Sequence, residues 1–269
     1  MKKLIFGLIA TVVFGFVGNA QNSTNDLGTY NVDNLYASNE LPIVSSNFNS
    51  SVNNNNVVVR KWWATAIVDA SGAIGGAAAG AQFINIASAT PWGWAAIGGC
   101  ALICGAGASL AKVGNVKPND NNIKGLSNEL NEFDWVGVKH NLIINDYFEN
   151  YLEYNPEDYY NFIVKNKDKY EIKDVYITKE YLEKQFETVK NINTDEDVYE
   201  YALSNLPEEV NKEDFKKFLI NLSTIDSNDE FIETVKVYEN KLIQSKLSDE
   251  TKIQLSTFFS TLRYSKNLW

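Results

Sequence analysis

The sequence feature that most constrains the fold is a long stretch with almost no charge and very small side chains. Over residues 62–111, half of the 50 positions are Gly or Ala, and Asp69 is the only charged residue. A glycine in a water-exposed helix costs roughly 0.5–1 kcal/mol relative to alanine. So many glycines therefore imply either close packing of backbones or a non-aqueous environment.

A turn signal divides this stretch into two segments of helical length. Residues 90–93 read Thr-Pro-Trp-Gly, which is typical of a turn. The flanking segments, roughly 62–89 and 94–112, are each long enough to cross a bilayer, because 20 helical residues extend about 30 Å. We therefore expect a Gly/Ala-rich hydrophobic helical hairpin within residues 58–117.

Aromatic and basic residues at the ends of the predicted helices favour contact with a membrane. Tryptophan prefers membrane interfaces, and basic side chains there would meet lipid headgroups. The residues that carry this expectation are Trp62, Trp63, Trp92, Trp94, Arg60, Lys61 and Lys112. Against it, Asp69 would cost about 3 kcal/mol at a bilayer centre. A hairpin buried in a water-soluble core fits the same residues.

Small residues at helical spacing predict that the two hairpin helices pack backbone against backbone, as lipid-embedded helices do. The glycines that carry this expectation are Gly72, Gly76, Gly80 and Gly105. Cys100 and Cys104 lie four residues apart in the second helix. After export, oxidising conditions would allow these cysteines to form a disulfide. The geometry for a disulfide within one helix is poor, so we favour two small thiols packed against the partner helix.

The residues before the hairpin predict export followed by a flexible segment. Lys2 and Lys3 precede an uncharged apolar run, and Gly-Asn-Ala at 18–20 provides small residues for cleavage. Residues 1–20 are therefore expected to be a signal peptide, with a retained anchor as the alternative. Residues 21–57 are rich in Asn and Ser and are expected to be disordered. We expect a secreted, extracellular protein, with association with the cell envelope as the alternative.

Composition excludes several function classes. The net charge is −10, and residues 121–269 hold 29 acidic against 18 basic side chains. A nucleic-acid partner is not expected, because phosphate binding needs clustered Lys and Arg. One histidine and two cysteines are too few for a Cys/His metal site. No cofactor motif is present, so neither a metal nor a cofactor is expected.

Residues 123–269 predict an acidic all-α domain of about six helices. Helix-capping residues precede apolar residues at helical spacing, and the caps are Thr178, Thr194, Asn211 and Ser227. Asp134 is expected to cap a further helix that runs through His140. The fold class is therefore mainly α: the helical hairpin, followed by a multi-helix domain, after a disordered N-terminal region.

One local pattern in this domain resembles a known signature. Its residues are Asn131, Asp134, Gly137, His140 and Asn141. The pattern is similar to a D-x-x-G-x-x-H-N motif in uncharacterised secreted bacterial proteins of the Bacteroidetes type. Several of these carry a signal peptide and a Gly/Ala-rich stretch that resembles membrane-active bacteriocins. Glu132 departs from the usual proline of that signature. The resemblance implies the organisation of the chain and leaves the role of the motif open.

The motif allows three interpretations. The simplest is a hydrogen-bond cluster that closes the entry of a helix; binding of a ligand or partner is the second. Catalysis with His140 as a base is the third, but spacing identifies no nucleophile with an orienting carboxylate. We therefore expect no enzyme.

Taken with the predicted hairpin, these patterns favour a secreted, bacteriocin-like protein whose hairpin interacts with lipid membranes. The alternative is a non-enzymatic secreted or envelope-anchored interaction protein. Its hairpin would be an anchor or a packed core, with a protein partner or self-association through the hairpin.

Overall fold

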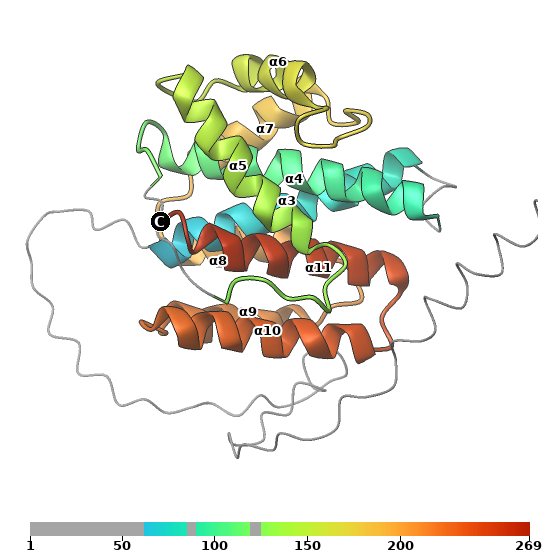
Figure 1. Cartoon of the computed structure of the whole chain (residues 1–269). Coiled ribbons are helices and arrows are strands. Elements are labelled where there is room, and N and C mark those ends of the chain that lie inside the picture. The colour runs from blue at the N-terminus through green and yellow to red at the C-terminus, as the bar shows by residue number, and fades with distance from the viewer. Residues whose placement is uncertain (1–61, 85–89, 119–124) are drawn as a thin grey trace, which may run out of the picture. The chain divides into compact units, whose positions relative to one another are not determined.

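The computed structural model of the chain describes residues 62–84, 90–118 and 125–269 (Figure 1). These residues all belong to one compact unit. The expected signal peptide, the expected flexible segment, Arg60 and Lys61 lie outside the described residues, as does the side chain of Trp92.

The described residues form nine α-helices and no strand, which confirms the prediction of a mainly α fold. The helices are α3 (Trp62–Ile84), α4 (Pro91–Val113), α5 (Asp134–Asn150), α6 (Pro156–Asn166), α7 (Lys179–Val189), α8 (Asp195–Ser204), α9 (Lys212–Ser223), α10 (Asn228–Gln244) and α11 (Asp249–Ser265). Helices α3 and α4 form the predicted hairpin, and the seven others make up the acidic region.

Most helices begin where capping chemistry predicts. Thr194 with Asp197 forms the predicted reciprocal capping box. The turn predicted at residues 90–93 is wrong in its bounds, because α4 already begins at Pro91 and the Thr90 hydroxyl caps it by accepting a hydrogen bond from the Gly93 N–H (3.2 Å). Thr178, Asn211 and Ser227 likewise accept hydrogen bonds from the first turns of α7, α9 and α10. These side chains satisfy N–H groups that have no partner inside the helix.

The expected cap at Asp134 is wrong. Asp134 is the first residue of α5, and the flanking residue Phe133 makes no side-chain cap. The Asp134 carboxylate is turned instead toward α11, where Arg263 donates to it at 2.5 Å. A buried guanidinium competes for this carboxylate more strongly than a backbone N–H does, because a hydrogen bond between two charged groups is stronger.

Helices α3 and α4 pack antiparallel through their glycines. A Cβ atom at Gly72 would lie 2.5 Å from Cβ of Ala108, and one at Gly76 would lie 2.5 Å from the Cys100 carbonyl oxygen. Real Cβ atoms essentially never approach so closely, so only glycine permits this separation of the helices. Gly80 and Gly105 lie along the same interface, against Cys100 and Ala73.

The two cysteines lie inside this interface as free, buried thiols. Sγ of Cys104 and Sγ of Cys100 would each be 2.9 Å from a Cβ atom added at Gly76 and Gly80, respectively. Burial raises the pKa of Cys100 to about 12. The thiols therefore act as small apolar groups that fill the space above the glycines.

The remaining helices enclose the hairpin. Helix α11 contacts both hairpin helices, and it lies between the layer of α3, α4 and α5 and the layer of α9 and α10 (Figure 1). Helices α7 and α6 pack on α4, and α8 and α9 pack on α3.

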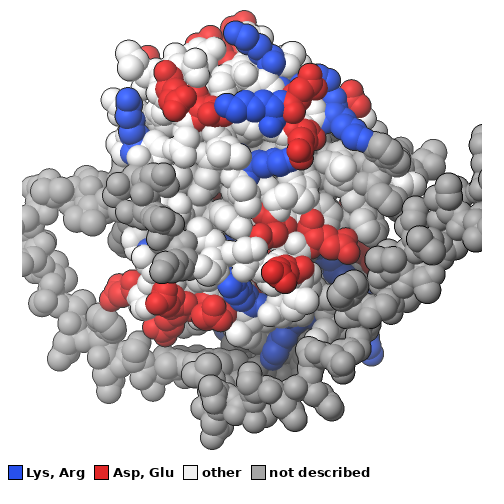
Figure 2. Space-filling view, in the orientation of Figure 1, with Lys and Arg blue, Asp and Glu red and all other residues white. Residues whose placement is uncertain are grey.

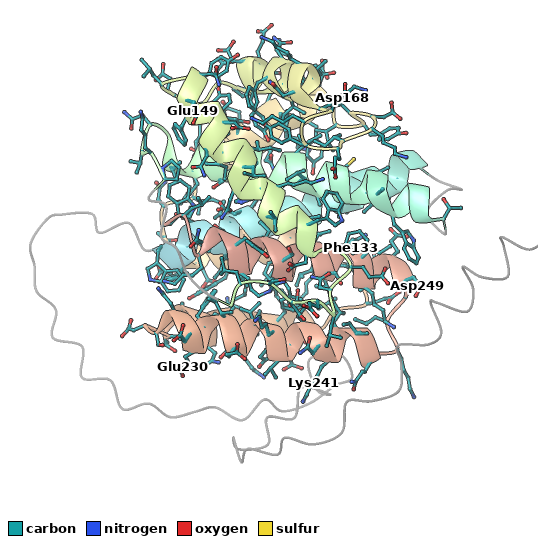
Figure 3. All side chains as sticks on the ribbon, viewed as in Figure 1. Phe133, Glu149, Asp168, Glu230, Lys241 and Asp249 are labelled. Carbon is teal, nitrogen blue, oxygen red and sulfur yellow. The ribbon has the colours of Figure 1, made fainter. Side chains whose placement is uncertain are left out.

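Glu230 and Lys241 lie in the first and last turns of α10 (Figure 3). Their charges oppose the partial charges of the helix ends.

Most charged side chains lie at the surface, and Figure 2 shows many of them on one face. Exposed ion pairs such as Lys216 with Glu196 (2.5 Å) link neighbouring helices at the surface. In contrast, Ile67 and Ile74 of α3 and Leu102 of α4 are fully buried. The least charged part of the sequence is therefore covered by the most charged part.

Candidate functional site between the hairpin and helix α11

The one carboxylate of the hairpin lies at the centre of a buried cluster, which we call the Asp69 junction. Its residues are Asp69 of α3, Ser109 of α4, His140 of α5, Ser265 of α11 and Trp269. Oδ2 of Asp69 accepts hydrogen bonds from Ser109 (2.8 Å), from Ser265 and from the Trp269 indole (3.2 Å). Oδ1 of Asp69 has no hydrogen-bond partner. The junction thus ties both hairpin helices to α5 and α11.

The neighbouring amide fixes the tautomer of His140. Nδ2 of Asn141 donates to the Tyr264 carbonyl (2.9 Å), which leaves Oδ1 of Asn141 facing Nδ1 of His140 at 2.9 Å. Nδ1 therefore carries the proton, because an amide oxygen only accepts. Nε2 of His140 is the unprotonated nitrogen; it has no hydrogen-bond partner and lies 3.8 Å from Oδ2 of Asp69.

Burial shifts the pKa of both groups in opposite directions. It raises the pKa of Asp69 to about 7, although the hydrogen bonds from Ser265, Ser109 and Trp269 lower it. It lowers the pKa of His140 to about 4, although Asn141 and the Gly105 backbone raise it. Burial disfavours the charged form of each group. Between these two values the junction holds one proton, on Asp69, and carries no net charge.

The D-x-x-G-x-x-H-N motif forms the surface of α5 against which α11 packs. The Gly137 N–H donates to the Ser260 hydroxyl (2.9 Å), and that hydroxyl donates to the Asp134 carbonyl (2.9 Å). A Cβ atom at Gly137 would lie 2.6 Å from the Ser260 carbonyl oxygen. Asn141 donates to the backbone of Tyr264. Asn131, Asp134, Gly137 and Asn141 of the motif thus contact α11, whereas His140 faces Asp69 of α3.

A buried arginine completes this contact at the start of α5, where Phe133 lies close to α11 (Figure 3). Nη2 of Arg263 donates to Asp134 and to Glu239, the latter at 2.9 Å, and the side chain of Arg263 is fully buried. Asn131 donates to the same Glu239 carboxylate and to the Ser256 carbonyl. Burial alone would lower the pKa of Arg263, but the carboxylates outweigh burial and raise it.

The chemistry of these groups is that of a structural contact. Both serines of the Asp69 junction donate to Asp69, whereas a serine nucleophile would donate to the histidine. Asp69, Ser109, His140 and Ser265 are each completely buried. Within the described ranges, no three His, Cys, Asp or Glu side chains are grouped as a metal ion would require.

Of the residues expected to contact a membrane, Trp62, Trp63, Trp94 and Lys112 have described side chains, and these lie against protein. Trp62 packs edge-on against Phe231, and Trp63 stacks on Tyr199. Lys112 donates to the Ile192 carbonyl at 2.6 Å. Trp94 is partly buried and lines an open cleft whose other lining residues include Leu130, Phe133, Leu242 and Ile253.

One described segment has the length and apolarity of a membrane span. It is Gly93–Val113 of α4, with a mean hydropathy of 1.6, and 78 % of it is buried inside the protein. Core helices of water-soluble proteins reach the same values, so this segment is compatible with both interpretations of the hairpin.

Comparison with family models, curated proteins and solved structures found no match to this chain. The function is therefore inferred from the geometry of the chain itself.

Several residues of the site were not predicted from the sequence. The contact with α11 depends on Ser260, Arg263, Ser265 and Trp269, together with Glu239 of α10. Polar residues in an amphipathic helix usually face water, so none of them indicated burial. Ser256 and Ser260 at a spacing of four, beside Thr257 and Thr261, are the signal that could have indicated a face of small polar residues.

Proposed function

We propose that this protein is a secreted, bacteriocin-like protein that stores an apolar helical hairpin inside a water-soluble helical shell and delivers it to lipid membranes. The observation that carries the proposal is the enclosure of α3 and α4 by helices whose outer faces are charged. The apolar surface of α3 and α4 would make the protein aggregate if it were exposed to water. The seven helices after the hairpin provide the cover.

The contact between α3 and α4 is compatible with both the protein interior and a lipid bilayer. It consists of glycine backbones and small side chains, and such packing does not depend on the exclusion of water. The Ser109 hydroxyl, which belongs to the hairpin, donates to Asp69. The hairpin could therefore leave the shell as a pair and retain one hydrogen bond to its only carboxylate.

A permanent core is the second candidate. Ser265 and Trp269 also donate to Asp69, and these bonds favour a hairpin that stays in place. In that case the protein is a non-enzymatic secreted or envelope-anchored interaction protein, which binds its partner through the outer helices.

The test measures binding of residues 21–269 to vesicles of phosphatidylglycerol and of phosphatidylcholine, and release of dye from these vesicles. Ala79→Lys and Ala79→Ser are a matched pair of variants, because the Ala79 side chain is partly exposed near the turn end of α3. Ala79→Lys should leave the protein folded, because a long side chain at this partly exposed position can reach water. It should reduce vesicle binding about ten-fold or more, since lysine is disfavoured in a bilayer. Ala79→Ser should bind like the wild type. Equal binding by both variants, or no release of dye by the wild type, would favour the permanent core.

A further inference from the structure

Helix α11 packs apolar side chains against its neighbours, with Phe258 and Phe259 against Phe215 and Phe218 of α9. It also connects the hairpin to the rest of the protein through buried polar contacts. The buried polar side chains of α11 include Thr257, Ser260, Thr261, Arg263 and Ser265. Toward α5 and α10 these side chains make hydrogen bonds and ion pairs. Water can replace such bonds when a contact opens, so each contributes little net stability.

The contact of α3 with α5 and α11 holds two buried polar atoms without partners. Oδ1 of Asp69 and Nε2 of His140 are buried without hydrogen-bond partners. Buried polar atoms without partners favour any opening that admits water. Lys266 completes this contact: its amine lies 2.9 Å from the centre of the Trp62 ring, at the start of α3.

The contact between α3 and α4 has the opposite character. It is formed by glycines, alanines and the two thiols, and none of the atoms nearest to Gly72, Gly76 or Gly80 belongs to α11. Displacement of α11 would remove two donors from Asp69 but leave Ser109 in place. The two interfaces of α3 should therefore open separately.

We propose that α11 is the latch of the hairpin: it holds α3 and α4 inside the shell, and its displacement exposes them while they remain paired. The consequence for lipid binding rests on the proposed function, whereas the separate opening of α11 does not. The motif at Asp134, Gly137 and Asn141 is then the surface that receives the latch.

The test compares two probes in residues 21–269. Hydrogen–deuterium exchange of the α11 amides reports displacement of the latch. Reaction of Cys100 and Cys104 with a thiol reagent reports separation of α3 from α4, because both thiols lie between these helices. Each probe gives an equilibrium constant for opening. In the wild type, the constant from exchange of the α11 amides should be larger than the constant from reaction of the thiols. Identical opening constants in urea below the unfolding transition would overturn the proposal.

Two variants make the comparison sharper, because both remove hydrogen-bond donors to Oδ2 of Asp69. One removes the donors on the α11 side, and the other removes the donor from the hairpin. Ser265→Ala with Trp269→Phe removes the two donors on the α11 side, and should increase α11 exchange about ten-fold or more without changing thiol reactivity. Ser109→Ala removes the hairpin donor and should increase thiol reactivity as well. An equal effect of both variants on both probes would overturn the latch. If the double variant does not fold, the wild-type comparison in urea decides alone.

Binding to vesicles of phosphatidylglycerol tests the proposed function independently of the latch. The double variant should bind them more strongly than Ser109→Ala does. Faster α11 exchange without stronger vesicle binding would support the latch and contradict delivery to membranes.

Discussion

The opposite pKa shifts of Asp69 and His140 predict a pH dependence that appears only when one of the two is replaced. The pKa of Asp69 rises from 3.8 to about 7 on folding, so Asp69 stabilises the folded protein in acid and loses this effect as the pH rises toward 7. The pKa of His140 falls from 6.5 to about 4, so His140 stabilises the folded protein above pH 6.5 and loses this effect as the pH falls toward 4. The two effects cancel because folding moves one proton from His140 to Asp69.

Linkage gives the size of each effect. From about pH 8 to about pH 5, Asp69 adds roughly 2–3 kcal/mol to the free energy of unfolding, and His140 subtracts roughly 2 kcal/mol. The wild-type pair should therefore contribute less than about 1 kcal/mol of pH dependence. Asp69→Asn should lose stability relative to the wild type on acidification, and His140→Gln should gain it. Tyr201 also senses the charge of Asp69, but burial raises its pKa far above this range.

The assay is urea unfolding of the wild type and both variants at the two pH values. Differences from the wild type cancel the titration of all surface groups. Parallel pH profiles for the three proteins would refute the reasoning, because they would mean that neither group is shifted by burial.

Two further predictions concern packing and charge. Gly76→Ala should lower the free energy of unfolding by about 1–3 kcal/mol because its Cβ would meet the Cys100 carbonyl oxygen at 2.5 Å. Gly99→Ala, whose Cβ would lie 3.6 Å from Cγ2 of Ile172, should be neutral or stabilising in the same thermal unfolding assay. Arg263→Met should cost roughly 3–5 kcal/mol in urea unfolding, since it leaves the buried Glu239 carboxylate uncompensated. Adding Glu239→Gln should recover part of this loss, and an additive loss in the double variant would contradict the pairing.

Local signals predicted much of the fold. Thr178, Thr194, Asn211 and Ser227 each mark a helix start as predicted, because a cap is a contact between residues two or three apart. Thr90 with the following proline was interpreted as a turn, although the same cap chemistry starts α4 there. The four-residue spacing of Gly72 and Gly76 predicts a close helix contact for the same reason: periodicity is local.

The site depended on contacts that no local pattern encodes. Asp134 meets Arg263, which lies 129 residues further along the chain, and Asp69 meets Ser265, which is 196 residues away. Asp134 was expected at a cap because nothing in its vicinity indicates a buried arginine. The motif with Gly137 could be recognised as unusual, but its partner helix could not, since serine and threonine occur equally on exposed helix faces.

The central claim is that the hairpin can move from the shell into lipid as one unit. Hydrogen–deuterium exchange of residues 21–269, with and without phosphatidylglycerol vesicles, tests it most directly. We predict that vesicles protect the amides of α3 and α4 while those of α11 exchange faster than in the lipid-free protein. An exchange pattern that is the same with and without vesicles would contradict the claim and identify the hairpin as a permanent core.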